Sequence, residues 1–534
     1  MSGVRRTSKR WTLGGVVVAT AFAVAAVQPV AAAPNNNNSK KLRAAVTVDG
    51  ILEHQQALQD ISDANGANRL AGAPGYEDSA DYVAARAEAA GYDVTIQEFE
   101  YDLDFLADWQ APVLAVEGGR EFVAGIAGAQ PGGDFGSMYN TAAYGTDITA
   151  PVWAADLNVP TASDDLTTSG CEASDFDGME AGSIAVVQLD LFSGSGCGFN
   201  PVFNAFGAGA GGIVVIQTGQ PGETGSLWID FSGTDFPAMA ATFDAGIALA
   251  NGVLAGDTGQ TAQFKIDWRP GTYTTKNVIA QSKRGDPDNV IVVGAHLDSV
   301  GVGPGINDNG SGSSTILEIA EQMKKVKPRN AVRFIWFGAE ESGLLGSEAY
   351  VDSLSQDEID QIAAMLNFDM VGSPNFARFV YDGDLSDSEP PPSGAPEGSA
   401  QIEELFVDYF DSQGLANEPT AFSGRSDYGP FIEVGIPAGG LFTGAEGIKT
   451  EEQVALYGGT AGEQYDGCYH LSCDDIDNLS LTALDQMSDA AAHVTISLAQ
   501  NTEAINGARG KGNFKPKPSG QHMDVSAPLP LTLP

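Results

Sequence analysis

Residues 289–299 read Asn-Val-Ile-Val-Val-Gly-Ala-His-Leu-Asp-Ser, a continuous apolar run that ends in a histidine and an acid. Residues 290–295 have the length and the β-branched content of a strand buried on both faces. The stretch 305–312, Gly-Ile-Asn-Asp-Asn-Gly-Ser-Gly, follows this strand and leads into a helix expected at 311–323, with a serine cap. A buried strand, a glycine-rich loop and a helix in this order are typical of an α/β sheet.

The same alternation of strands and helices continues on both sides of this unit. Further strands are expected at 93–101, 331–337 and 365–370. Helical patterns predict helices at 54–64, 78–90, 347–354, 357–363, 402–413 and 481–500. We therefore predict an α/β fold in which a mixed sheet, mostly parallel at its centre, is sandwiched by helices.

Between residues 105 and 272 the sequence changes in character, because glycine is dense and the expected strands are short. Two candidate buried strands, 184–189 and 212–217, are separated by a helix of small residues expected at 201–209. The stretch contains no cluster of acids and histidines. We therefore predict a β-rich, non-catalytic domain at 105–272, inserted between the two parts of the α/β domain, 47–104 and 273–504.

The two ends of the chain are expected to lie outside these domains. Four basic residues among the first ten precede an apolar stretch at 11–27 and a small-residue site, Ala31-Ala32-Ala33. This order predicts a signal peptide at 1–33, followed by a flexible leader or pro-segment at 34–46. Residues 505–534 are rich in Gly, Pro and Lys, which predicts a disordered or processed tail. We expect a secreted, extracellular chain with no stable membrane association.

The chain is strongly acidic, with 27 Lys and Arg against 70 Asp and Glu and a formal net charge of −43. Such a chain repels phosphates, so a nucleic-acid partner is not expected. Its apolar content of 43% is ordinary for a globular chain, so the acidity indicates a solvated surface and not disorder. We expect a monomer.

In an exported chain the four cysteines are expected to form disulfides. Pairing between neighbours, Cys171 with Cys197 and Cys468 with Cys473, is the simplest of the possible connectivities. No Cys-x-x-Cys spacing occurs, so zinc binding by cysteine is disfavoured.

Six acids and histidines lie at the ends of predicted strands or in loops: His296, Asp308, Glu340, Glu341, Asp369 and His470. Sites in α/β sheets form at the carboxyl ends of strands, so these side chains are expected to meet. Taken singly, each has an ordinary structural explanation, such as a turn at Asp308. Together they supply what a two-metal hydrolase needs: a carboxylate between two ions, a histidine and a carboxylate at each ion, and a free carboxylate as base.

The motifs resemble those of the secreted bacterial di-zinc aminopeptidases of the leucine aminopeptidase type, which are co-catalytic zinc peptidases. The resemblance covers roughly residues 50–104 and 273–504. It rests on Asn68-Arg69, Ala-His-Leu-Asp-Ser at 295–299, Asn-Asp-Asn-Gly-Ser-Gly at 307–312, Ala-Glu-Glu-Ser-Gly-Leu-Leu-Gly-Ser at 339–347, Asn-Phe-Asp-Met at 367–370, Arg-Ser-Asp-Tyr-Gly-Pro-Phe at 425–431 and Cys-Tyr-His-Leu-Ser-Cys at 468–473. The insert is similar to a protease-associated domain.

The resemblance implies a cofactor of two Zn²⁺ ions and a ligand set. One ion would be held by His296 and Asp369, and the other by Glu341 and His470. Asp308 would bridge the two ions.

The resemblance also implies roles for side chains beside the ligands. Glu340 would be the general base, and Tyr469 would donate a hydrogen bond to the developing oxyanion. The Cys468–Cys473 loop would hold Tyr469 and His470 in place. Asp298 would orient His296.

Three further expectations come from the same resemblance. Arg425 would lie beside the substrate cleft, near the free amino end of the peptide. A cis peptide bond would join Asp308 and Asn309. Asp485 and Asp489 match the spacing of a structural Ca²⁺ site, although a matching ligand from the N-terminal part is not evident.

The leading hypothesis is a zinc aminopeptidase that removes N-terminal residues, large apolar ones such as Leu, from peptides or proteins. One alternative is a related carboxypeptidase, which would need a basic residue such as Arg425 for the substrate carboxylate. Another is a non-catalytic binding ectodomain on the same scaffold, a class that loses metal ligands, whereas all are present here. A serine hydrolase is disfavoured, since no Gly-x-Ser-x-Gly motif occurs.

Overall fold

The structure is a computed structural model, and it describes residues 38–103, 109–125, 133–137, 139–141, 145–159, 167–189, 197–219, 230–234, 237–267, 269, 271–388 and 390–508. The predicted signal peptide at 1–33 and residues 509–534 of the predicted tail lie outside these ranges. The prediction of a tail from residue 505 was wrong at its start, because residues 505 and 506 end helix α13 (Glu503–Asn506) and Ile505 and Ala508 are buried. Within the described ranges, no helix has both the length and the apolar character needed to cross a lipid bilayer.

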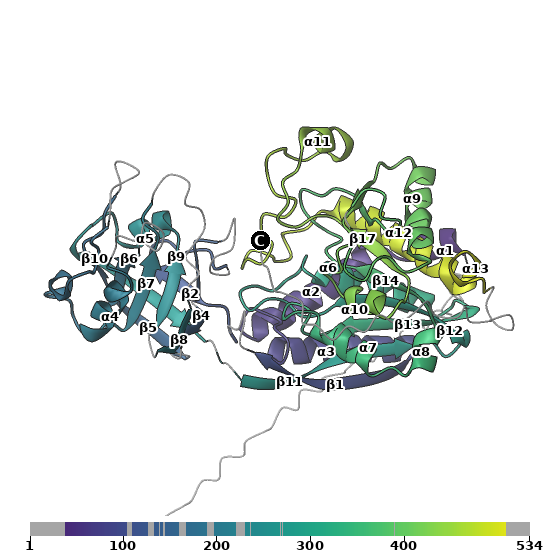
Figure 1. The fold of residues 1–534 in the computed structure, drawn as a ribbon, viewed down its shortest axis with the longest axis horizontal. Coiled ribbons are helices and arrows are strands. Elements are labelled where there is room, and N and C mark those ends of the chain that lie inside the picture. The colour runs from purple at the N-terminus through teal and green to yellow at the C-terminus, as the bar shows by residue number, and fades with distance from the viewer. Residues whose placement is uncertain are drawn as a thin grey trace, which may run out of the picture. The chain divides into compact units, whose positions relative to one another are not determined.

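One eight-stranded sheet organises the α/β domain, with the strand order β1-β11-β13-β12-β14-β17-β15-β16 (Figure 1). The strands are β1 (Asp93–Leu103), β11 (Gly271–Gln281), β12 (Asp286–His296), β13 (Asn330–Phe337), β14 (Ile362–Phe368), β15 (Phe379–Tyr381), β16 (Glu418–Thr420) and β17 (Ala438–Phe442). β12 pairs in parallel with β13 and β14, and β14 pairs in parallel with β17. β1 and β11 are antiparallel, as are β11 and β13. The predicted mixed sheet with a parallel centre is confirmed.

The helices of this domain agree with most of the predicted ranges. They are α1 (Ser39–Arg43), α2 (Val48–Ala64), α3 (Pro74–Ala90), α6 (Gly310–Met323), α7 (Leu345–Asp352), α8 (Gln356–Gln361), α9 (Ser399–Gln413), α10 (Gly429–Glu433), α11 (Glu451–Tyr457), α12 (Leu481–Gln500) and α13 (Glu503–Asn506). The helix predicted at 357–363 was wrong at its end, because β14 already begins at Ile362. Ile362 pairs with Val290 of β12, so pairing with a distant strand outweighs the local helical pattern.

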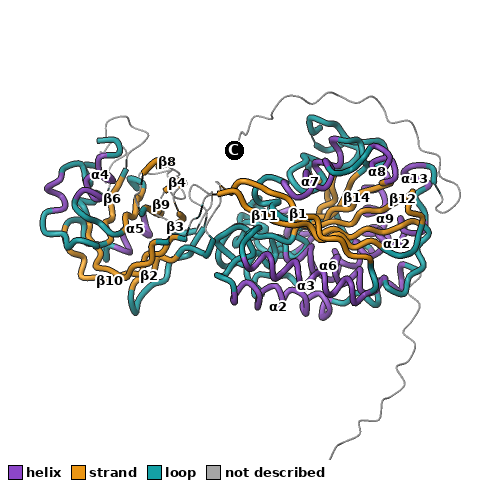
Figure 2. The backbone as a smooth tube through the Cα atoms, turned by 90° about the horizontal axis from the view of Figure 1, so that it is seen from below, coloured by secondary structure: helices purple, strands orange, loops and turns teal. Residues whose placement is uncertain are grey.

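Helices cover both faces of the sheet, as predicted. Side chains alternate along β12, so Ile291, Val293 and Ala295 pack in one apolar cluster with α2, α3, α6 and α12. Val290 and Val292 point to the other face and pack in a second cluster with α7 and α10. Figure 2 shows α2, α3 and α6 on one side of the strands and α7 and α8 on the other. Burial on both faces explains why the β12 sequence is continuously apolar.

The segment between β1 and β11 contains a second, seven-stranded sheet in the order β2-β10-β5-β6-β7-β9-β3, and a two-stranded sheet of β4 and β8. The strands are β2 (Val113–Val116), β3 (Phe135–Ser137), β4 (Tyr139–Thr141), β5 (Thr146–Ala154), β6 (Ile184–Gln188), β7 (Gly212–Ile216), β8 (Asp230–Thr234), β9 (Ala238–Ala241) and β10 (Gly256–Ile266). The helices are η1 (Ala173–Phe176), α4 (Asn200–Gly207) and α5 (Phe243–Leu249). The strands predicted at 184–189 and 212–217 and the helix predicted between them correspond to β6, β7 and α4.

Both disulfides have the predicted neighbour pairing. Cys171 bonds to Cys197, and Cys468 bonds to Cys473. The second bridge joins cysteines five positions apart in the sequence and closes a short loop that contains Tyr469 and His470.

The N-terminus of α6 is locked against the end of β14. Asn309 caps α6, and its Oδ1 accepts hydrogen bonds from the Gly312 N–H at 2.9 Å and the Met370 N–H at 3.2 Å. Its Nδ2 donates to the Phe368 carbonyl at 2.9 Å. A Cβ on Gly312 would overlap that same carbonyl oxygen, so only glycine permits this approach.

Gly312→Ala is therefore expected to lower the free energy of unfolding by about 1–3 kcal/mol, because it forces two packed elements apart. Denaturant unfolding of the full chain measures this change. Gly207→Ala is the matched control, since a Cβ there meets nothing within 4 Å and the residue lies in α4. Equal effects of the two substitutions would contradict the account of the α6–β14 junction.

Candidate metal centre and active site

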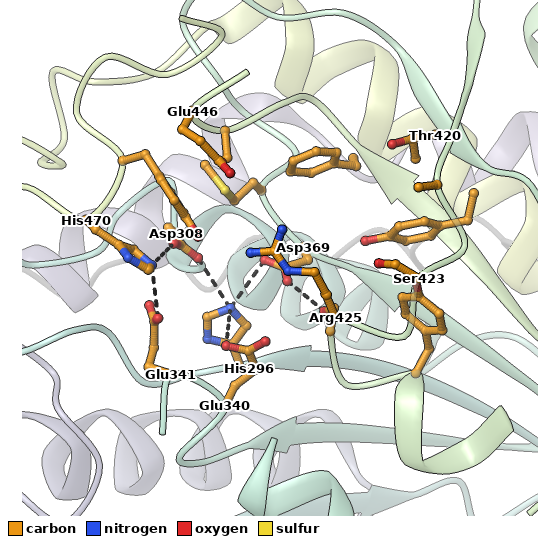
Figure 3. Close-up of a pocket in the computed structure, with 18 residues that line it drawn as sticks. His296, Asp308, Glu340, Glu341, Asp369, Thr420, Ser423, Arg425, Glu446 and His470 are labelled. Atoms are coloured by element: carbon orange, nitrogen blue, oxygen red, sulfur yellow. Dashed lines mark hydrogen bonds and ion pairs between the residues drawn. The ribbon is translucent and has the colours of Figure 1, made fainter. Parts of the chain in front are cut away.

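Three neighbouring parallel strands deliver ligands to one edge of the sheet. His296 is the last residue of β12, Glu340 and Glu341 follow β13, and Asp369 follows β14 directly. Because β13 and β14 flank β12 in parallel, their carboxyl ends meet at that edge. The structure brings these predicted residues together (Figure 3).

Asp308 lies between the two histidines, with one carboxylate oxygen toward each. His296 Nε2 is 3.3 Å from Asp308 Oδ1, and His470 Nε2 is 3.2 Å from Asp308 Oδ2. His470 has a φ of +57° in the loop closed by Cys468–Cys473. The expected cis peptide bond between Asp308 and Asn309 is present.

Each histidine also faces a second carboxylate, which gives two groups that share Asp308. His296 Nε2 is 3.2 Å from Asp369 Oδ1, and His470 Nε2 is 3.0 Å from Glu341 Oε2. Figure 3 shows these two groups side by side, joined through Asp308.

The geometry of both groups fits zinc. Ligand atoms around a tetrahedral zinc ion with bonds of about 2.0–2.1 Å lie about 3.3 Å apart, which is close to the 3.0–3.3 Å found here. Glu341 Oε1 is buried, and no group in the described part of the chain donates a hydrogen bond to it. Imidazole nitrogen with carboxylate oxygen is a ligand chemistry that zinc accepts and calcium does not favour.

Glu340 lies slightly outside the two groups. Its Oε2 is 4.0 Å from His296 Nε2, farther than the oxygens of Asp308 and Asp369. Its carboxylate can be grouped with His296 and Asp369, but the longer distance makes it the free acid of the set. Burial raises the pKa of the Glu340 carboxyl well above its usual range, although His296 opposes the shift.

The titration of the histidines is dominated by the surrounding acids. Burial alone would lower the pKa of His296, but Asp369 and Glu340 outweigh it, and the pKa is well above its usual value. In the same way, Glu341 and Asp308 outweigh burial and raise the pKa of His470. Without metal, both imidazoles therefore carry a proton to higher pH than usual.

Asp298 is hydrogen-bonded to the backbone of both glutamates. It is fully buried, and its carboxylate accepts the backbone N–H of Glu340 at 3.2 Å and of Glu341 at 3.3 Å. Its Oδ1 also lies 3.6 Å from His296 Nδ1, while its backbone oxygen is 3.2 Å from that nitrogen. The contact with His296 was anticipated, whereas the contact with both glutamates was not.

Two positioning residues escaped the sequence analysis. The buried Asp474 accepts the backbone N–H of Asn307 at 2.8 Å and of Asp308 at 2.9 Å. Ser426 Oγ donates to Asp369 Oδ2 at 2.6 Å, which leaves Oδ1 toward His296. Ser426 lies inside the quoted motif at 425–431 and Asp474 directly after the one at 468–473, and this position is the signal that the sequence carries.

A buried arginine supports the loop beneath the site. Arg69 Nε donates to the Pro304 carbonyl at 2.8 Å and Nη2 to the Gly305 carbonyl at 2.6 Å, and Nη1 contacts the Leu297 carbonyl. Burial lowers the pKa of Arg69 to about 10, and Asp298 is the first of several acids that oppose the shift. A guanidinium with this pKa stays charged at neutral pH, so it offsets part of the negative charge of the site.

The ligands open into a cavity of about 200 Å³. Arg425 and Tyr469 line its wall, as expected. The Tyr469 ring stacks on that of His470 with centroids 3.9 Å apart. Burial, followed by the charges of Asp308 and Glu341, raises the pKa of the Tyr469 hydroxyl well above its usual value, so it remains a donor. Apolar and aromatic side chains form part of the wall (Met370, Tyr381, Ala421, Tyr428, Phe442 and Ala445), and polar or acidic side chains, Thr420, Ser423, Ser426 and Glu446, also line it.

The two acids matched to calcium lie elsewhere, on α12. Asp489 Oδ2 is bound by Arg43 Nη1 at 2.8 Å and by the Tyr409 hydroxyl at 3.2 Å. A guanidinium thus already neutralises this carboxylate. Burial, with the nearby Asp489, raises the pKa of Asp485.

The fold and the site define a metal-dependent hydrolase, and comparison with known proteins agrees. Residues 277–495 match the model of peptidase family M28. The chain is 40% identical over 492 residues to an aminopeptidase of Pseudomonas aeruginosa, covering 89% of this chain and 85% of the relative. It is 35% identical over 484 residues to leucine aminopeptidase 2 of Arthroderma otae, covering 90% of each.

Among solved structures, BSAP, a zinc aminopeptidase from Bacillus subtilis, shares the fold with a TM-score of 0.50 and 24% identity. The match covers 85% of this chain and 95% of that one. The chain therefore belongs to peptidase family M28. It is a hydrolase of the aminopeptidase type.

Ser426→Ala should weaken zinc binding by about 10–100-fold, because the oxygen of Asp369 that faces away from His296 loses its hydrogen-bond donor. Zinc titration of the chelator-treated chain measures this change. Ser423→Ala, a serine of the same cavity wall, is the control. Unchanged zinc affinity in Ser426→Ala would show that Asp369 does not depend on this contact.

Zinc affinity should also fall as the pH is lowered. The pKa values of His296 and His470 are raised in the metal-free site, so zinc must displace protons from them. Calorimetric titration in buffers of different ionisation enthalpy at about pH 7 should detect proton release. Binding without proton release would mean that the histidines are not ligands.

Proposed function

We propose that the chain is a secreted aminopeptidase that uses two zinc ions to hydrolyse the peptide bond after an N-terminal residue. The observation that carries the proposal is the position of Asp308 between two histidine–carboxylate pairs, with Glu340 left as a free acid. Membership of peptidase family M28 and the aminopeptidase names of the relatives support the reaction class.

In this proposal His296 and Asp369 would hold one ion, Glu341 and His470 would hold the other, and Asp308 would offer one carboxylate oxygen to each. When bound, the two ions polarise the scissile carbonyl and lower the pKa of the attacking water. The contacts of Asp298, Ser426 and Asp474 keep the ligands in this arrangement, since each fixes an acid or the backbone that carries one.

Glu340 acts as the general base. Its carboxylate takes a proton from the attacking water and later gives it to the leaving amine. The burial that raises the pKa of the Glu340 carboxyl suits this role, because a more basic carboxylate accepts a proton more readily.

Tyr469 and the cavity wall act on the substrate. The Tyr469 hydroxyl, which remains protonated, donates a hydrogen bond to the oxyanion that develops on the scissile carbonyl. The apolar wall accepts a large apolar side chain such as Leu, and Arg425 lies near the amino end of the peptide. The leucine aminopeptidase names of the fungal relatives support this preference.

The alternatives have less support. A carboxypeptidase would use Arg425 to bind a substrate carboxylate, whereas the relatives are aminopeptidases. A non-catalytic ectodomain would not be expected to retain the complete ligand set and Glu340. Calcium at Asp485 and Asp489 gains no support, because neither acid belongs to a group of three or more potential ligands in the described part of the chain.

The proposal extends to the organisation of the chain. Residues 1–33 form a cleaved signal peptide and 34–46 a leader, and 105–272 form a protease-associated-like domain between the parts of the peptidase domain, 47–104 and 273–504. Residues 505–508 belong to the folded domain, because they include the end of α13 and the buried Ala508, and we propose that the segment after residue 508 is processed off. The two disulfides are compatible with an extracellular, monomeric enzyme.

Glu340→Gln should reduce kcat for Leu-anilide hydrolysis by about 10²–10⁴-fold while the zinc content stays the same, because the base is lost but no ligand is. Steady-state kinetics with metal analysis checks both results. N-acetylated Leu-anilide is the control substrate and should not be hydrolysed by either form. Hydrolysis of C-terminal residues from amino-blocked peptides would instead favour the carboxypeptidase alternative.

A further inference from the structure

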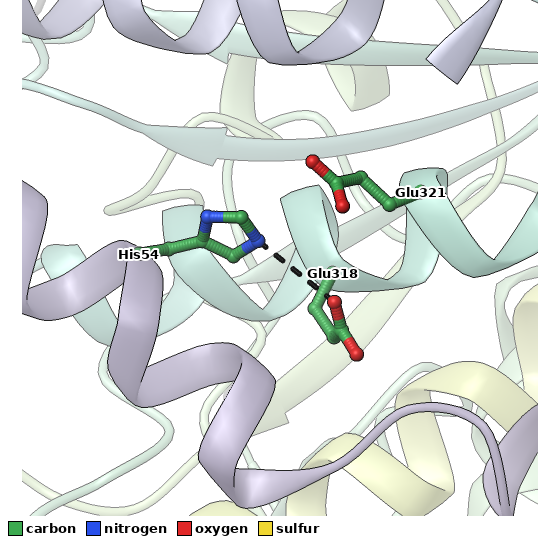
Figure 4. Close-up of side chains that lie close together, drawn as sticks. All are labelled: His54, Glu318 and Glu321. Atoms are coloured by element: carbon green, nitrogen blue, oxygen red, sulfur yellow. Dashed lines mark ion pairs between the residues drawn. The ribbon is translucent and has the colours of Figure 1, made fainter. Parts of the chain in front are cut away.

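A second group of potential ligands lies between α2 and α6, in a different part of the α/β domain. It consists of His54 on α2 and of Glu318 and Glu321 on α6, whose ligand atoms all lie within 4.8 Å of one another (Figure 4). None of the three lines the cavity of the metal centre. His54 is 1% exposed and Glu318 is 4% exposed, so this is no ordinary surface cluster of acids.

His54 presents an unpartnered nitrogen to these acids. Its Nδ1 is held by the Tyr82 hydroxyl at 2.8 Å. Its Nε2 is buried, and no hydrogen-bond partner for it exists in the described part of the chain. That nitrogen faces Glu318 Oε2 at 3.8 Å, which is longer than a hydrogen bond of about 3.5 Å or less. A cation between this buried nitrogen and the carboxylate would satisfy both groups.

The charged side chains around this cluster also favour a bound cation. Arg86 Nε binds Glu321 Oε1 at 2.6 Å, and Arg86 Nη1 binds Glu53 at 2.8 Å. The amide of Gln322 donates to Glu318 Oε1 at 3.2 Å and carries no charge. Water screens Glu53, whose side chain is 65% exposed. Glu318 and Glu321 with one guanidinium therefore leave one negative charge when His54 is neutral, and a divalent ion offsets it.

The packing of the helices fixes the Glu318 carboxylate in place. A Cβ on Gly50 would lie 2.5 Å from Glu318 Oε1, so the absence of a side chain at Gly50 lets α2 approach the carboxylate. The backbone of α2 at Gly50 therefore lies directly against the carboxylate and limits its movement on that side.

We propose that His54 Nε2, Glu318 and Glu321 form a binding site for a divalent transition-metal ion such as Zn²⁺. The 3.8 Å gap is shorter than two zinc–ligand bonds, about 4 Å in total, so one ion can reach His54 and Glu318 without movement of either. The mixed nitrogen and oxygen donors favour zinc over magnesium or calcium. The Tyr82 contact orients the ring, as a hydrogen bond to the second nitrogen does at other histidine metal sites.

The site is structural, since it joins α2 to α6 and is separate from the catalytic cavity. α6 begins two residues after Asp308, so an ion at Glu318 stabilises the helix that follows the bridging ligand. Loss of the ion should therefore reduce stability and leave the chemistry unchanged.

The test compares the zinc content of the full chain with that of His54→Phe and Glu318→Gln, after chelator treatment and titration with Zn²⁺. Each variant should bind one zinc ion per chain fewer than the wild type, and its Tm should rise less when zinc is added. Glu318→Gln keeps an acceptor for Gln322, so it remains informative where His54→Phe does not fold.

Glu53→Gln is the matched control, because Glu53 pairs with Arg86, its side chain is 65% exposed, and it lies outside the group of proposed ligands. It should bind as much zinc as the wild type. Equal zinc content in the wild type, His54→Phe and Glu318→Gln would overturn the proposal and assign the cluster to a buried His54–Glu318 ion pair. The readout is a difference between variants, so it is independent of the catalytic zinc count and of the proposed function.

Discussion

The structure depends on the confinement of four carboxylates, Asp308, Glu340, Glu341 and Asp369, at one sheet edge. Each side chain is at most 15% exposed, so water cannot screen their mutual repulsion. Two imidazoles lie among them, and their raised pKa values reflect this negative field. Positive charge between the acids would stabilise such a site, and the two zinc ions of the proposed function would supply it.

The remaining residues around the site keep the acids from relaxing apart. Asp298 fixes the backbone of both glutamates, Ser426 fixes Asp369, and Asp474 fixes the backbone of Asp308. Arg69 holds the adjoining loop through backbone carbonyls. The supports come from segments far apart in sequence, so the arrangement forms only when the whole α/β domain has folded.

The sequence predicted the fold and the site best where an apolar strand pattern is followed directly by an acid or a histidine. The apolar run before His296 predicted β12, and the acids after the next strands predicted the site, because parallel strands end at a common edge. The positioning roles of Ser426 and Asp474 could not be predicted, since a serine or an aspartate in a loop has no local pattern. The start of β14 at Ile362 was also missed, because it is set by pairing with Val290, a contact over long sequence separation that the local helical pattern does not show.

The bridge through Asp308 is the central claim, and X-ray diffraction from zinc-loaded crystals at the zinc absorption edge tests it most directly. The account predicts two anomalous peaks, one beside each oxygen of Asp308 at about 2.0–2.2 Å, with His296 and His470 on opposite sides. A single peak, or two peaks that Asp308 does not join, would contradict it.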